Sequence, residues 1–60
     1  MDIELMGILE DIAISIEAAK RNLARNDIPS VLYCVDRAEM DAMRARNLTV
    51  SIMRHGDKNA

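Results

Sequence analysis

The sequence predicts an all-α protein, an antiparallel two-helix hairpin that associates with further copies into a four-helix or larger bundle. Three observations predict it. Two long segments carry apolar residues at alternating spacings of three and four, one strong break separates them at residues 25–30, and the charges match an antiparallel pair. The chain has 60 residues, so we expect residues 1–60 to form one domain, with residues 56–60 as a frayed tail.

The first helix is expected from about residue 3 to residue 25. Its apolar seam recurs at spacings of four and three over five intervals, which is a heptad pattern. The seam residues are Leu5, Leu9, Ile12, Ile16, Ala19 and Leu23.

The break between the two segments contains residues that favour a helix end and a helix start. Asn26 tolerates the left-handed backbone that closes many helices. Asp27 is a favoured N-cap, and Pro29 is tolerated in a first helical turn. The sequence therefore predicts a short turn here.

The second helix is expected from about residue 28 to residue 54. Its seam alternates spacings of three and four throughout, and the alanines at its centre favour a close approach of helices. The seam residues are Ile28, Val31, Val35, Ala38, Ala42, Ala45, Thr49 and Ile52. Residues 48–52 also alternate with period two, so a strand stays open as an alternative for residues 48–54.

The charge distribution favours an antiparallel hairpin. Residues 1–19 hold five acidic and no basic side chains, and residues 20–26 hold three basic ones. Residues 27–41 hold four acidic side chains and one basic, whereas residues 42–60 hold four basic and one acidic. Folding at the turn places opposite charges beside each other and places acids at each helix start, where the helix dipole favours them.

A chain of this size gains stability from association. A compact globule of 6.7 kDa exposes roughly 3900 Å², and a two-helix hairpin buries less than such a globule. We therefore expect the chain to be its own first partner. The expected self-association core consists of Leu5, Leu9, Ile12, Ile16, Leu23, Val31, Val35, Ala38, Ala42, Ala45 and Ile52.

Apolar residues outside the seams favour a second protein as a further partner. Ile14, Tyr33 and Met40 are the expected contact residues for it. The five methionines fit adaptable packing against more than one surface. The sequence therefore predicts a small protein-interaction protein with a regulatory role.

The sequence does not predict an enzyme, a metal site or a cofactor site. The single Cys34 and single His55 are 21 residues apart, which is about 32 Å along a helix, too far for a nucleophile–base pair. Cys34 is interpreted as a small core residue. The acidic group Asp36, Glu39 and Asp41 is interpreted as a solvated helix face.

Nucleic acid binding is the competing hypothesis, although the net charge is −2 and Tyr33 is the only aromatic residue. The basic residues that would contact RNA or DNA are Lys20, Arg21, Arg25, Arg44 and Arg46. The layout of a short chain, two helices and heptad seams resembles the small plasmid-encoded Rop-type hairpin dimers that bind RNA. No Rop motif residue can be matched, so the resemblance assigns no RNA-binding residue.

A second resemblance covers residues 2–54 with the hinge Asn26-Asp27-Ile28-Pro29. The chain looks like the short helical-hairpin accessory proteins encoded in early regions of lambdoid phages. That resemblance implies a small regulator that acts on host or phage proteins and has no catalytic residues.

The sequence predicts no membrane span. The longest apolar-looking stretch, residues 3–19, contains four carboxylates, which are too costly in a bilayer. The first residues lack the basic start of a signal peptide, so we expect a cytoplasmic location, where one free thiol is ordinary.

Overall fold

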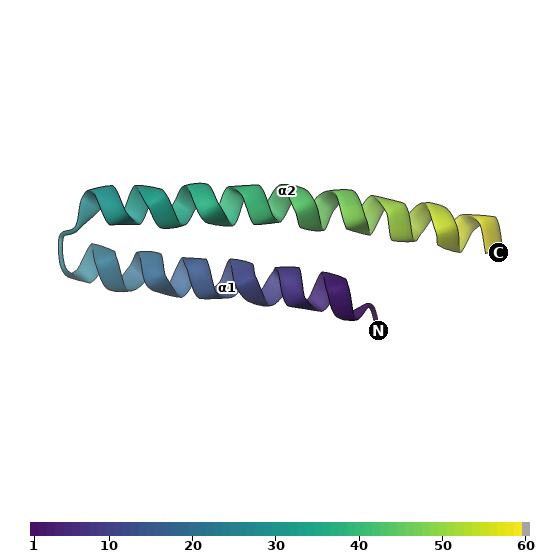
Figure 1. Ribbon diagram of the computed structural model, residues 1–60, viewed down its shortest axis with the longest axis horizontal. Helices are drawn as coiled ribbons and strands as arrows, with labels where there is room; N and C mark the ends of the chain where they lie inside the picture. Colours follow the sequence, from purple (N-terminus) through teal and green to yellow (C-terminus); the bar gives the residue numbers. More distant parts are fainter. Residues whose placement is uncertain (60) are drawn as a thin grey trace.

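A computed structural model describes the backbone of residues 1–59 and the side chains of residues 1–56. Helix α1 spans Ile3–Ala24 and helix α2 spans Ile28–Asn59. The two helices run antiparallel and pack side by side as a rod of 50 × 17 × 11 Å (Figure 1). The predicted all-helical hairpin is confirmed, and the predicted helix starts at residues 3 and 28 match the structure.

The start of α1 is fixed by Asp2, which lies just outside the helix in an extended conformation. Its side-chain oxygen Oδ1 accepts a hydrogen bond of 2.8 Å from the backbone N–H of Leu5. This bond satisfies one of the free N–H groups of the first turn and stabilises the helix end.

The turn closes α1 with a Schellman motif. The backbone N–H of Asp27 donates to the carbonyl oxygen of Asn22 at 2.9 Å, and that of Asn26 donates to the carbonyl of Leu23 at 3.0 Å. Asn26 adopts a left-handed conformation with φ of 60°, as expected from its residue type.

Helix α2 begins directly after this motif, because Asp27 also caps it. The carboxylate of Asp27 accepts a hydrogen bond from the hydroxyl of Ser30 at 2.7 Å, and a longer one from the backbone N–H of Ser30 at 3.4 Å. Pro29 lies in the first turn, where its missing N–H costs nothing. One aspartate thus completes the end of one helix and the start of the next.

Helix α2 continues beyond the boundary predicted at residue 54. Residues 48–54 are helical, so the helical alternative is confirmed for them and the strand alternative is wrong. Gly56 does not end the helix, which continues to Asn59. The predicted fraying of residues 56–60 stays a prediction, and residue 60 lies outside the described residues. The end of α2 extends past the start of α1 (Figure 1).

The seam between the helices combines mainly small side chains of α2 with larger ones from the first half of α1. On α2 the buried residues follow spacings of four, three and four at Cys34, Ala38, Asp41 and Ala45. On α1 the buried residue is Ile8, and the partly buried ones at seam spacing are Leu5, Ile12, Ser15, Ala19 and Asn22. Among the side chains of residues 1–56, no large one is completely buried.

Every second residue of this seam is the one just before the residue that the sequence predicts, so that Ile8 takes the place of Leu9 and Cys34 the place of Val35. The predicted seam agrees with buried or partly buried residues at Leu5, Ile12 and Ala19 of α1 and at Val31, Ala38 and Ala45 of α2. Six other residues of the expected self-association core are exposed in the hairpin and therefore do not form its seam, and their place in a contact between chains stays a prediction. They are Leu9, Ile16, Leu23, Val35, Ala42 and Ile52.

Candidate interaction surfaces

The hairpin has two broad sides, one on each flank of the seam. Asp11 and Arg37 line a hollow on one side, and each directly precedes a seam residue, Ile12 or Ala38. A residue that directly follows a seam residue is turned the other way around the helix. Leu9, which follows Ile8, therefore lies on the opposite side of the hairpin. The two sides have different chemistry.

The first side, which we call the mixed face, carries a hollow of about 280 Å³ formed by both helices. Ile14 and Tyr33, both predicted as partner contacts, lie together in its lining, next to Asp11 and Arg37. Met40, the third predicted contact, is exposed but does not line the hollow. Apolar and charged side chains therefore alternate on this face.

Asp41 also lines this hollow. From the sequence it is expected to belong to a solvated acidic helix face. That interpretation is wrong, because only 7% of Asp41 is exposed. Its carboxylate accepts a hydrogen bond of 3.1 Å from the guanidinium of Arg44. Cys34 is buried beside it, as predicted, and its Sγ accepts a hydrogen bond of 3.6 Å from the side chain of Asn22.

The second side, which we call the apolar face, presents large apolar residues of both helices to solvent. Because they lie at heptad spacings on the flank opposite the hollow, they share one face of the hairpin. The apolar residues of this face are Met6, Leu9, Ala13, Ile16, Leu23, Ile28, Leu32, Val35, Ala42 and Met53. Three charged residues lie in the same rows, Lys20 in the row of Met6 and Ala13 on α1, and Glu39 and Arg46 in the row of Leu32 and Met53 on α2.

The total exposed surface of the hairpin is larger than that of a compact protein of the same mass. The chain exposes 4904 Å². A compact protein of 6.7 kDa exposes roughly 3900 Å², so the hairpin exposes about 1000 Å² more than a globule of its mass. Each partner in a stable protein complex typically buries about 800 Å². The excess is therefore large enough for one interface.

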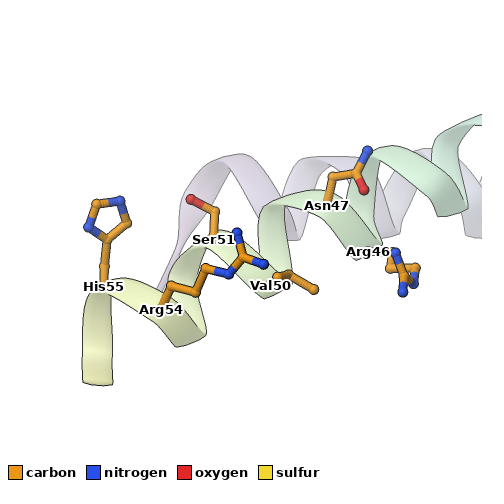
Figure 2. Close-up of a pocket in the computed structure, with 6 residues that line it drawn as sticks. All are labelled: Arg46, Asn47, Val50, Ser51, Arg54 and His55. Atoms are coloured by element: carbon orange, nitrogen blue, oxygen red, sulfur yellow. The ribbon is translucent and has the colours of Figure 1, made fainter. Parts of the chain in front are cut away.

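A further depression of about 620 Å³ lies on the outer surface of α2, near its carboxyl end. Figure 2 shows that its lining side chains all come from this one helix. Arg46, Arg54 and His55 lie along it together with polar Asn47 and Ser51. The depression is a shallow basic surface rather than an enclosed site.

The structure does not gather the five basic residues predicted for nucleic acid contact on one face. Arg44 pairs with Asp41, and Lys20 pairs with Glu17 at 3.3 Å. Arg21 follows Ile14 by seven residues and so shares its side of α1, whereas Lys20 lies at the margin of the apolar face. Arg25 caps the end of α1, and Arg46 belongs to the outer surface of α2.

Within the residues that the structure describes, no group of three or more His, Cys, Asp or Glu side chains is placed to hold a metal ion. Neither described helix combines the length and the apolar character that crossing a membrane requires.

Comparison with protein-family models, with curated proteins and with solved structures finds no match to this chain.

Proposed function

We propose that this chain is a small, non-enzymatic protein-interaction protein that associates with itself through the apolar face. The observation that supports this proposal most strongly is the difference between the two sides of the hairpin. One side mixes charged and apolar residues around a hollow, whereas the other exposes a face on which Leu, Ile, Val and Met predominate. Faces of this kind mark contact surfaces in water-soluble proteins.

The seam within one chain is too thin to explain the apolar content of the helices. Alanine, serine and cysteine fill much of it and bury little apolar area, so its large apolar side chains come mainly from Leu5, Ile8 and Ile12. The larger residues Leu9, Ile16 and Val35 remain outside it. Association that covers them supplies the hydrophobic stabilisation that a 60-residue chain needs.

Self-association through the apolar face leaves the mixed face accessible to a second protein. The hollow with Ile14 and Tyr33 combines an aliphatic and an aromatic side chain with the charges of Asp11 and Arg37. Such a mixture is typical of surfaces that bind other proteins reversibly. We propose a regulatory role of this kind, as in the phage accessory proteins that the chain resembles in layout.

Two matched isoleucines test the proposal. Ile16 lies on the apolar face and is 43% exposed, whereas Ile14 lies on the mixed face and is 64% exposed. Ile16→Asp should convert the associated protein into a monomer, because it places a charge in the proposed interface. Ile14→Asp introduces the same residue into the same helix and should leave the mass in solution unchanged.

Sedimentation equilibrium of the two variants, with circular dichroism to measure helix content, gives the answer. Equal masses for both variants and the unmodified chain would contradict association through the apolar face. Loss of association in Ile14→Asp alone would place the interface on the mixed face instead.

The basic surface of α2 supports a second candidate function, binding of RNA or DNA. Arg46, Arg54 and His55 lie on one stretch of helix, and two copies of the chain would present it twice. Binding of this kind should weaken steeply with salt and should be lost in Arg54→Ala. Absence of any retained duplex or loop RNA or duplex DNA at low salt would exclude it.

A further inference from the structure

We infer that the occupant of the apolar face is a second copy of this chain, placed so that the two turns lie at opposite ends of a four-helix bundle. In this arrangement α2 packs antiparallel to the partner's α2 around a two-fold axis near Ala42. The inference rests on the proposed function and specifies the geometry of its interface.

The outer row of the apolar face on α2 can pair with the same row of a second copy that runs in the opposite direction. At intervals of seven residues it presents Leu32, Glu39, Arg46 and Met53, that is, apolar, acidic, basic and apolar. When an identical helix runs in the opposite direction about a centre between residues 42 and 43, Glu39 faces the partner's Arg46. Leu32 then faces the partner's Met53, and the two-fold axis repeats both pairs.

The next row of the same face has the same symmetry. Val35, Ala42 and Thr49 follow one another at intervals of seven, with the smallest side chain in the middle. Reversal about Ala42 places Val35 against the partner's Thr49 and the two copies of Ala42 against each other. A small residue at the axis allows the two helices to approach closely there.

Helix α1 fits the same axis. The turn joins residue 24 of α1 to residue 28 of α2. Residues that lie the same number of positions from these two helix ends therefore lie at the same distance along the rod. The axis at residues 42–43 of α2 therefore crosses α1 near residues 9–10. Met6 then faces the partner's Ala13, and the two copies of Leu9 meet at the centre. Lys20 lies beyond the partner's first residue and stays in water.

The alternative with both turns at the same end gives poor contacts. There α1 lies against the partner's α2 at equal heights. Met6 would then face the partner's Arg46, Ala13 the partner's Glu39, and Lys20 the partner's Leu32. Every charged residue of these rows would oppose an apolar one, at a cost in desolvation.

The extra length of α2 also favours turns at opposite ends. The end of α2 passes the start of α1 (Figure 1), and Met53, which lies in the last turns of α2, is 63% exposed. In the proposed arrangement the partner's Leu32 and the first turns of its α2 cover this end. With both turns at the same end, the two overhanging ends lie diagonally and remain uncovered.

A distance measurement between the two turns separates the arrangements. A spin label on Arg25→Cys, in a Cys34→Ser background, reports it by pulsed electron resonance. Turns at opposite ends predict a separation of about 45 Å between the labels, from the helical rise on either side of the axis. Turns at the same end predict about 15 Å, close to the width of a bundle.

Charge reversal tests the pairing of Glu39 with the partner's Arg46. Glu39→Arg and Arg46→Glu should each weaken the dimer about tenfold, because each creates two repulsive pairs. The double variant should restore the dimer. Asp36→Arg is the control with the same charge change away from the proposed contact, and it should leave the dissociation constant unchanged.

The outcomes distinguish the two proposals. A chain that stays monomeric overturns both the proposed association and the inference. A dimer with a short label distance, or one that the double variant fails to restore, overturns the inference and leaves association through the apolar face intact. A long distance together with restoration supports the inference.

Discussion

Asn26 is the residue on which the turn depends most directly. Its φ of 60° is costly for residues with a branched Cβ and free for glycine. Asn26→Val should lower the free energy of unfolding by about 1 to 2 kcal/mol, whereas Asn26→Gly should not lower it. Thermal unfolding followed by circular dichroism measures both, and equal effects would contradict the role of the left-handed conformation.

The carboxylate of Asp41 is buried in the seam and forms an ion pair with Arg44. Arg44→Ala should destabilise the hairpin by about 1 kcal/mol, because it leaves a buried acceptor without that partner. Asp41→Leu removes the buried charge and should not destabilise it, since a buried ion pair often stabilises no more than an apolar side chain. Chemical denaturation of both variants tests this difference, and a larger loss in Asp41→Leu would contradict it.

The residues at the turn could be predicted from the sequence, but the burial of Asp41 could not. Asn26, Asp27 and Pro29 act through their own backbone preferences, which need no knowledge of distant contacts. The burial of Asp41 depends on which flank of α2 faces α1. The signal that could have found it is the alternate seam that runs through Cys34, Ala38 and Ala45.

At the scale of the helices, the apolar stripe of each helix consists of three rows of residues, each row repeating every seven residues. Only two of these rows face the other helix of the hairpin. Sequence periodicity predicts the stripe, but it does not decide which two rows meet within one chain. The rows that meet contain Ser15, Ala19, Ala38 and Ala45, whose small side chains allow the two helices to lie close together. The row with Leu9, Ile16 and Leu23 is left for another contact.

The close approach of the two helices makes a testable prediction at Ala38, which is buried in the seam. Ala38→Leu should lower the free energy of unfolding by about 1 to 3 kcal/mol, because the larger side chain does not fit without moving α1. Ala24→Leu adds the same volume at an exposed helical position and serves as the control. Equal unfolding temperatures for the two variants would show that Ala38 does not lie in a tight contact.

At the scale of the whole molecule, the proposed association would cover apolar side chains that a single hairpin leaves exposed. The hairpin is a thin rod whose seam buries several small side chains, while many large apolar ones, among them Leu9, Ile16 and Leu32, stay exposed. The sequence predicts that association is needed, because that need follows from size and composition alone. The face on which it occurs requires the hairpin geometry, since only the packing of α1 on α2 shows which rows remain exposed.

The most direct test of self-association is the mass in solution over a dilution series, measured by sedimentation equilibrium together with helix content. The account predicts twice the chain mass of 6.7 kDa at high concentration, with mass and helix content falling together on dilution. A species of 6.7 kDa that keeps its full helix content at every concentration would contradict it.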